Sequence, residues 1–200
     1  MYRAVLDTCV LVPSLQRDFL LQLATEEAYA PIWGSGILFE LDYVLTGLQD
    51  RRGISDSACR IQRLFDQLKQ AFPGSEVHAP KDRDYRYGLT DPDDGHVAYA
   101  AIIGKVDAIV TDDRRAGFST ASVLSEAGIE TVHPHQFAAN MASAHPHAGV
   151  RALREMANRR TNPPQAPEQI LQLLVTRHNM TEVAEILLPL LTETPGFPAD

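Results

Sequence analysis

Two short apolar segments of this chain run directly into aspartates, and this pattern most constrains how the chain can fold. Residues 2–6 end at Asp7, and residues 108–111 end at Asp112 and Asp113. Both segments have the length and apolar character of a buried strand. Segments with a helical spacing of apolar residues lie between them, so strands alternate with helices. This alternation predicts an α/β fold, with helices in outer layers around a small parallel sheet.

The helical pattern continues after the last predicted strand. We expect helices at residues 13–27, 37–48, 55–72, 95–103, 119–127 and 134–141, and a short strand at 130–132. Beyond residue 147 the pattern is helical only, and its apolar faces must be buried against protein. We therefore predict an α/β domain at residues 1–147 and an all-helical extension at residues 148–200, with residues 194–200 frayed.

Composition limits the class of protein. The formal net charge of -8 by itself argues against a nucleic-acid binder. A carboxylate metal site would account for part of this charge, and many basic residues are clustered arginines, which suit phosphate. Cys9 and Cys59 lack a CxxC spacing, which argues against zinc and fits a reducing cytoplasm. We expect no secretory leader and no membrane span, and therefore a cytoplasmic protein.

The acids that follow the two strands are candidate ligands. In open α/β sheets, ligands bind beyond the carboxyl ends of the strands, where Asp7 lies. The alternative role for Asp7 is to cap the next helix. Because side chains alternate along a strand, only one of Asp112 and Asp113 is expected to point into the crevice. Thr111 has a hydroxyl that can donate to a ligand carboxylate or to phosphate.

Two further acids lie on predicted helices. Glu40 borders the buried face of an apolar helix, where a carboxylate needs something positive as its partner, such as a metal or an arginine. Residues 91–94 read Asp-Pro-Asp-Asp, and Asp91 suits the cap of the helix that follows. Three acids in four residues exceed what capping needs. Asp94 is therefore, like Glu40, a candidate ligand on a predicted helix. His96 is expected to face away from Asp94, as a surface histidine.

Acids that converge in this way repel one another unless cations neutralise them. Hard divalent cations with oxygen ligands are the usual partners. Such a site suits displacement at phosphorus, in which metals activate water and stabilise the leaving oxygen. The pattern therefore predicts a metal-dependent enzyme that acts on phosphate esters.

Four stretches, at residues 5–11, 35–41, 91–100 and 109–113, carry a family resemblance. In order and spacing, over about residues 3–137, they resemble the PIN-domain family and in particular VapC-type toxins of bacterial toxin–antitoxin pairs. The resemblance implies Asp7, Glu40, Asp94 and Asp113 as metal ligands and catalytic residues. Thr111 falls where the family often has Ser or Thr. Cys9 stands where the family commonly has Asn. Asp91 and Asp93 stay as alternatives to Asp94, and Asp112 stays as an alternative to Asp113.

The same resemblance implies a function. It implies a Mg²⁺-dependent endoribonuclease, with Mn²⁺ as a substitute, that leaves a 5′-phosphate and belongs to a longer subfamily with a C-terminal helical extension. The implied partners are RNA, a second copy of the chain and a VapB-like antitoxin.

Two alternatives remain, and one group of residues has no assigned role. The alternatives to this ribonuclease are a non-catalytic RNA- or protein-binding domain of this type and a phosphatase of another α/β class. That phosphatase class has a second Asp at the position of Cys9. Tyr85, Tyr87, Tyr99 and Trp33 are candidates to stack on RNA bases.

Overall fold

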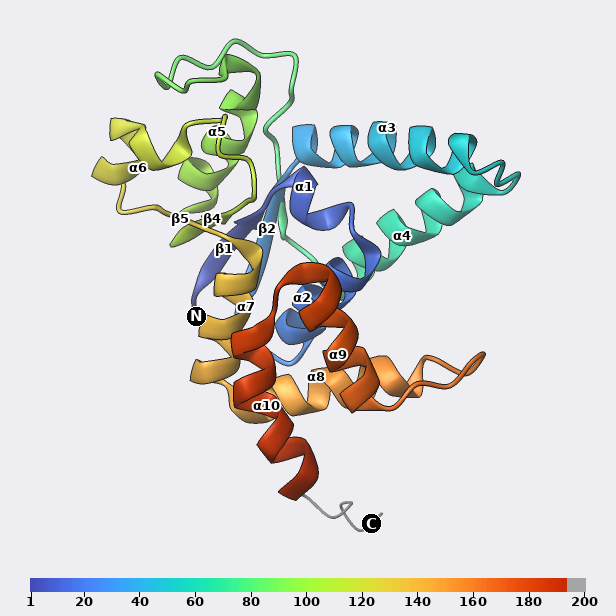
Figure 1. Ribbon diagram of the computed structural model, residues 1–200. Coiled ribbons are helices and arrows are strands. Elements are labelled where there is room, and N and C mark those ends of the chain that lie inside the picture. Colours follow the sequence, from blue (N-terminus) through green and yellow to red (C-terminus); the bar gives the residue numbers. More distant parts are fainter. Residues whose placement is uncertain (194–200) are drawn as a thin grey trace. The chain divides into compact units, whose positions relative to one another are not determined.

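The computed structural model describes residues 1–193, which fall into two compact units (Figure 1). The first comprises Met1–Pro13 and Ala30–Val132, and the second comprises Ser14–Tyr29 and the chain from His133 onward. The second unit therefore combines a segment near the N-terminus with the C-terminal helices. The domain boundary between residues 147 and 148 stays a prediction, and the predicted fraying of residues 194–200 falls outside the described residues.

A five-stranded parallel sheet forms the centre of the first unit, and this confirms the predicted α/β class. The strands are β1 (Arg3–Leu6), β2 (Ala30–Gly34), β3 (Glu76–Val77), β4 (Ala108–Val110) and β5 (Glu130–Val132). Their order across the sheet is β3-β2-β1-β4-β5. In the central strand, Val5 pairs in register with Ile32 on one side and Ile109 on the other. All three side chains are buried, as expected of a central parallel strand.

The helices of the first unit mostly follow the predicted ones. They are α1 (Thr8–Leu11), α3 (Ser35–Arg51), α4 (Ser57–Ala71), α5 (Gly95–Gly104) and α6 (Ser122–Glu126), with the 3₁₀ turns η1 (Pro92–Asp94) and η2 (Phe118–Thr120). The predicted helix at 119–127 is interrupted because Ala121 has an extended backbone between η2 and α6. Helix α1 was not predicted, since a single turn is too short to show a periodicity.

The order of the strands explains why the acidic segments meet. The chain passes from β1 to β2 on one side, whereas β4 pairs with the other side of β1. This reversal is a topological switch point, where ligands bind in open α/β sheets. Asp7 directly follows β1, Thr111 directly follows β4, and α3 begins directly after β2. All three segments therefore leave the sheet at the same edge.

The second unit is entirely helical in its described residues. Its helices are α2 (Ser14–Thr25), α7 (Pro134–Ala144), α8 (Pro146–Asn158), α9 (Pro167–His178) and α10 (Thr181–Glu193). Tyr29 and Phe137 pack edge to face at 4.8 Å, and Arg151 Nε donates to Glu26 Oε2 at 2.7 Å. Leu174 on α9 and Leu187 on α10 are fully buried, which confirms the predicted burial of these apolar faces. Within residues 1–193, no helix is long and apolar enough to cross a membrane.

Candidate active site

A pocket of about 720 Å³ lies in the first unit at the edge where β1 ends. It brings together the four acids that the sequence singled out from four separate segments. The residues that line it are Asp7, Thr8, Cys9, Val12, Phe39, Glu40, Tyr43, Val44, Lys81, Asp94 and Asp113. Phe39 and Tyr43 on α3 are mostly exposed, so the wall formed by α3 presents apolar side chains beside the carboxylates.

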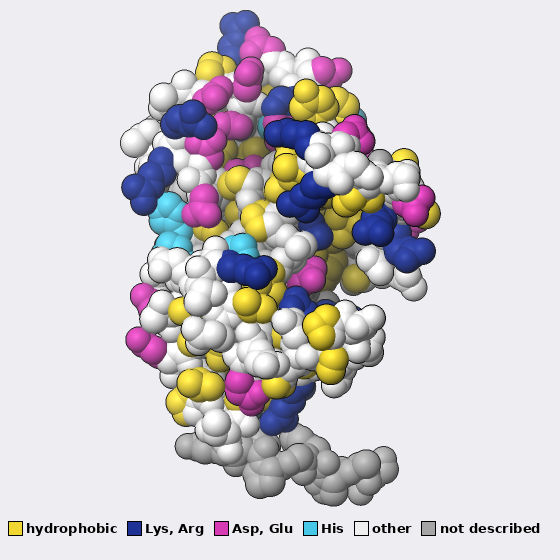
Figure 2. All heavy atoms as spheres, turned by 45° about the vertical axis from the view of Figure 1, so that its right-hand side comes forward, with side chains coloured by type: hydrophobic (Ala, Val, Ile, Leu, Met, Phe, Trp, Pro, Cys, Tyr) yellow, Lys and Arg dark blue, Asp and Glu magenta, His cyan; other side chains and the backbone are white. Residues whose placement is uncertain are grey.

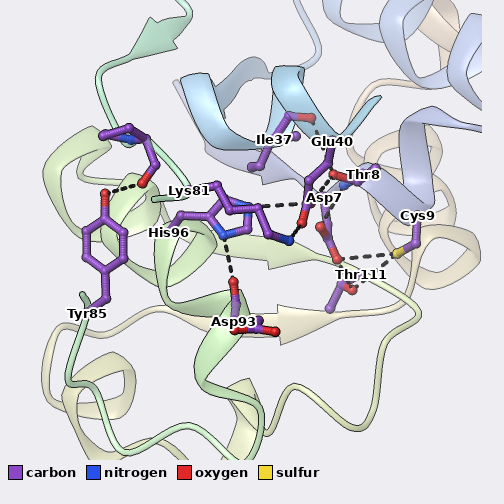
Figure 3. Close-up of polar contacts among 11 residues, drawn as sticks. Asp7, Thr8, Cys9, Ile37, Glu40, Lys81, Tyr85, Asp93, His96 and Thr111 are labelled. Atoms are coloured by element: carbon purple, nitrogen blue, oxygen red, sulfur yellow. Dashed lines mark hydrogen bonds and ion pairs between the residues drawn. The ribbon is translucent and has the colours of Figure 1, made fainter. Parts of the chain in front are cut away.

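Asp7 accepts hydrogen bonds from the residue that follows it in the chain and from the residue that follows β4 (Figure 3). The backbone amide of Thr8 donates to Oδ1 at 2.6 Å, so Asp7 caps α1 as well as lining the pocket. The Thr111 hydroxyl donates to Oδ2 at 2.6 Å, as expected of Thr111. Cys9 Sγ lies 3.4 Å from Oδ2 and 3.3 Å from Thr111 Oγ1. Asp7, although only 7% exposed, is thus satisfied by donors and oriented at the pocket wall.

The Cys9 thiol takes part in this network as a neutral group. Burial, and next the charge of Asp7, raise the pKa of Cys9 to about 12. A thiol with such a pKa stays protonated at neutral pH and is a poor nucleophile. Cys9 therefore supplies hydrogen bonding rather than covalent chemistry.

Among the three acids at residues 91–94, the structure places Asp94 in the pocket. Asp91 caps η1 by accepting from the Asp93 amide at 3.0 Å, and both Asp91 and Asp93 are exposed. Burial, followed by the charges of Asp7, Asp91 and Asp113, raises the pKa of Asp94 to about 6. Burial is the largest cause, and the contributions of Asp7 and Asp113 come from carboxylates that line the same pocket.

Of the two acids after β4, Asp113 lines the pocket, whereas Asp112 is exposed. The Asp113 carboxylate accepts from the backbone amide of Arg115 at 2.7 Å, and its own amide donates to Thr111 Oγ1 at 3.0 Å. Thr111 therefore links Asp7 and Asp113 through one hydroxyl. The catalytic and metal-binding roles of the four acids stay predictions.

Glu40 meets the positive partner that its half-buried position requires, and this partner is Lys81 (Figure 3). The Lys81 ammonium pairs with Oε1, and the Thr8 hydroxyl donates to Oε2 at 2.8 Å. The sequence pattern missed Lys81 because it lies in a polar loop without periodicity. The available signal in the sequence was the position of Glu40 beside a buried helix face, where a carboxylate needs a positively charged partner.

His96 corrects one prediction. It is fully buried rather than on the surface, with Nε2 3.4 Å from Glu40 Oε2 and Nδ1 3.0 Å from the Asp93 carbonyl. Burial lowers its pKa, so it is a neutral neighbour of Glu40 near pH 7. The prediction was wrong because it used only the angle between His96 and Asp94 around α5. That angle carries no information on α3, which packs against the side of α5 that carries His96.

Gly36 allows that close packing. A Cβ added to it would lie 2.6 Å from His96 Cδ2 and 2.8 Å from the Ala79 carbonyl oxygen. The Gly36 amide donates to this carbonyl at 2.9 Å, and Ser35 Oγ accepts from the Ala79 amide at 3.1 Å. The start of α3 is thus fixed against the segment that leads to Lys81.

We expect the substitution Gly36→Ala to lower the free energy of unfolding by about 1–3 kcal/mol, because a backbone oxygen cannot yield as a side chain can. Gly47→Ala in the same helix is the matched control. Its Cβ would meet only Arg51 at 3.7 Å, and alanine should stabilise the helix by about 0.5–1 kcal/mol. Urea unfolding measures both, and equal effects of the two substitutions would contradict the close contact.

The pocket matches a hard divalent cation in donor chemistry but not as a closed coordination shell. Its acidic side chains are carboxylates, which suit Mg²⁺ or Mn²⁺, and burial together with the charges of Asp7, Asp91 and Asp113 raises the pKa of Asp94. However, within residues 1–193 no group of three or more His, Cys, Asp or Glu side chains is set to hold a metal ion. Lys81 provides the positive charge at Glu40. Asp7, Asp94 and Asp113 are the other acids that line the pocket.

Comparison with known proteins agrees with this fold. The family model of the PIN domain matches residues 3–115, which is more than half of the chain. The chain therefore belongs to the PIN-domain family. A second model, that of the VapC50 C-terminal domain, matches residues 134–189. The chain is thus a PIN-domain protein of the VapC type with a C-terminal extension. No curated protein and no solved structure gave a significant match.

Membership in this family points to a toxin ribonuclease, and so to a nuclease among the hydrolases. PIN domains generally use divalent metal ions. VapC proteins bind RNA and are generally paired with a VapB antitoxin. The matches confirm the resemblance to PIN domains of the VapC type that was seen in the sequence.

Proposed function

We propose that this chain is a metal-dependent endoribonuclease, the toxin of a type II toxin–antitoxin pair, and that it hydrolyses RNA phosphodiester bonds in the acidic pocket. One observation carries the proposal. Four acids from four segments of the chain line a single pocket at the switch point of a parallel sheet. Burial, and next the charges of Asp7, Asp91 and Asp113, raise the pKa of Asp94 to about 6, and a pocket lined by acids in this way suits metal-assisted phosphoryl chemistry.

The side chains of the pocket have distinct tasks in this proposal. Asp7, Asp94, Asp113 and, beside them, Glu40 would hold Mg²⁺ or Mn²⁺, which when bound supplies the positive charge that activates water and stabilises the leaving oxygen. Thr111 fixes the orientation of Asp7 by its 2.6 Å hydrogen bond. Lys81 is 36% exposed, so its ammonium can also donate to a phosphate oxygen of RNA at the mouth of the pocket.

The overall negative charge is compatible with this substrate. On the face shown in Figure 2, Lys and Arg side chains lie interspersed with Asp and Glu side chains. Phosphate contacts depend on such local cations more than on the net charge. The proposed partners are RNA, a VapB-like antitoxin and a second copy of the chain. The proposed location is the cytoplasm, where the free thiols Cys9 and Cys59 would stay reduced.

A non-catalytic PIN-like domain, which binds RNA or protein without cutting, is the second candidate. The pairing of Lys81 with Glu40 favours it, because a lysine already provides the charge that a metal would bring. The phosphatase alternative has no such support, since a neutral Cys9 stands where that class needs a second Asp. The deciding experiment incubates the full chain with RNA in Mg²⁺, in Mn²⁺ and in EDTA. Cleavage with metal and none in EDTA is expected, whereas intact RNA throughout supports the non-catalytic domain.

Metal binding should also be visible without RNA. Because the folded chain gathers acids that the unfolded chain separates, Mn²⁺ should stabilise the fold by about 2.7 kcal/mol at a hundredfold excess over its Kd. The substitution Asp113→Asn should reduce this gain, and Asp112→Asn, at an exposed neighbour, should not. Melting curves in EDTA and in Mn²⁺ measure the gain. A parent protein that does not respond to Mn²⁺ would contradict the metal site.

A further inference from the structure

The loop that carries Lys81 also carries a cluster of aromatic rings with an arginine. Tyr85 and Tyr87 stack with centroids 6.2 Å apart and an interplanar angle of 17°, and Tyr99 on α5 lies 5.0 Å from Tyr85. The Arg83 guanidinium lies 5.9 Å from the centroid of Tyr85 and 5.3 Å from that of Tyr99. We call these four residues, Arg83, Tyr85, Tyr87 and Tyr99, the tyrosine–arginine cluster.

The cluster is not part of the hydrophobic core. Its three tyrosines are each partly exposed and Arg83 is exposed. Trp33, by contrast, is 1% exposed and packs against Phe72 at 5.9 Å, so it is a core residue and not a candidate for stacking on RNA. Aromatic rings that stay partly in water beside an arginine offer surface for a planar ligand.

The cluster is anchored next to the acidic pocket. The Tyr85 hydroxyl donates to the Pro80 carbonyl at 2.8 Å (Figure 3). A Cβ on Gly95 would lie 2.5 Å from Tyr85 Cβ, so Tyr85 packs on the residue that directly follows Asp94. Tyr99 is four residues after Gly95, on the same side of α5. Lys81, at the start of the loop, lines the pocket itself.

We propose that the tyrosine–arginine cluster is a stacking site for unpaired nucleobases of the RNA strand that enters the acidic pocket. This inference rests on the proposed function and names the residues that would hold the strand beside that pocket. Aromatic and guanidinium planes are the usual platforms for bases splayed out of a single strand. In a duplex the faces of the bases are covered by their neighbours, so a duplex cannot use this site.

The charge of the loop also favours stacking over simple attraction to phosphate. Residues 81–87 read Lys-Asp-Arg-Asp-Tyr-Arg-Tyr, which gives three cations and two acids and a net charge of only +1. Asp84 is paired with Arg86 at 2.9 Å. Counterion release rewards only the cations that reach a phosphate, and Arg86 already has Asp84 as its partner, whereas each stacked base adds affinity without an ion pair.

Tyr87 provides the sharpest test, because its substitution leaves the packing of Tyr85 on Gly95 in place. The full chain in EDTA, which prevents cleavage, is titrated into a labelled single-stranded RNA of mixed sequence. We expect Tyr87→Leu to weaken binding by about fivefold to a hundredfold, and Tyr87→Phe, which keeps the ring, to change it by less than about twofold. An RNA strand with abasic sites should bind the parent and Tyr87→Leu alike.

Arg83 is tested with a matched arginine elsewhere. Arg83→Lys keeps the charge but loses the planar group, and should weaken binding of single-stranded RNA by about twofold to fivefold. Arg60→Lys, at an exposed position of α4, should leave binding unchanged. A duplex of the same sequence should bind more weakly than the single strand and should not respond to Tyr87→Leu.

The results separate this inference from the proposed function. If Tyr87→Leu binds single-stranded RNA as tightly as the parent, or loses affinity equally for abasic RNA, the stacking site is wrong, and the cluster belongs to a protein interface or to the packing of the loop. If the parent cuts RNA and the variants bind alike, the nuclease stands and the stacking site fails. If the parent does not cut RNA in any divalent metal while Tyr87→Leu weakens binding, the stacking site stands and the nuclease fails.

Discussion

The substitution Asp94→Asn should lower RNA cleavage by about a hundredfold or more, because it removes a pocket carboxylate that would hold the metal and keeps the size of the side chain. Asp94 is the acid of residues 91–94 that lines the pocket, and repulsion from Asp7 and Asp113 contributes to its raised pKa. The protein should still fold, because Asn suits the start of a helix as Asp does. Initial rates on a labelled RNA measure the effect, and circular dichroism verifies the fold.

The neighbouring acids are the controls for this substitution. Asp93→Asn changes an exposed side chain outside the pocket, and we expect the cleavage rate to stay within about threefold of the parent, as for most surface substitutions. Asp91→Asn should also keep activity, since Asn can accept the capping hydrogen bond from the Asp93 amide. A fully active Asp94→Asn protein, or an inactive Asp93→Asn protein, would show that the ligand has been assigned to the wrong residue.

The second large effect is on the pH dependence of stability without metal. Folding raises the pKa of Asp94 from 3.8 to about 6, so in this window the folded chain keeps a proton that the unfolded chain releases. The free energy of unfolding contributed by this group is therefore greatest below pH 3.8 and falls as the pH rises through 6. The loss should be about 2–3 kcal/mol, since each pKa unit corresponds to about 1.4 kcal/mol and solvent screening reduces the effect at a partly exposed group.

A difference measurement isolates Asp94 from its surroundings. The pKa of His96 is lowered on folding from 6.5, so its contribution decreases as the pH falls and opposes that of Asp94. Urea unfolding in EDTA of the parent and of Asp94→Asn, from about pH 4 to pH 7, gives the difference between the two curves. Asp94→Asn should be the more stable protein at pH 7, and the advantage should vanish at pH 4. A constant difference would mean that folding does not raise the pKa of Asp94.

Much of the site was predictable because local patterns report on strand ends. The buried strands before Asp7 and Thr111 are visible as short apolar runs, and the carboxyl ends of parallel strands share one edge. The position of Asp94 followed from the excess of acids at a helix start. The resemblance to PIN domains placed Glu40 with them, although its own pattern left its partner open. The choice of Asp113 over Asp112 needed the course of the chain after β4, which alternation alone did not give.

The sequence by itself determined the alternation of strands and helices, the parallel sheet and the acids that line its edge, because each depends on spacing within a short segment. Tertiary structure decided which groups meet across long separations. It paired Lys81 with Glu40, 41 residues apart, buried His96 beneath α3, and grouped α2 with the C-terminal helices. It also gathered Arg83 and three tyrosines beside the pocket. Such contacts depend on the path of loops, which have no periodicity, and on close packing that only the folded chain provides.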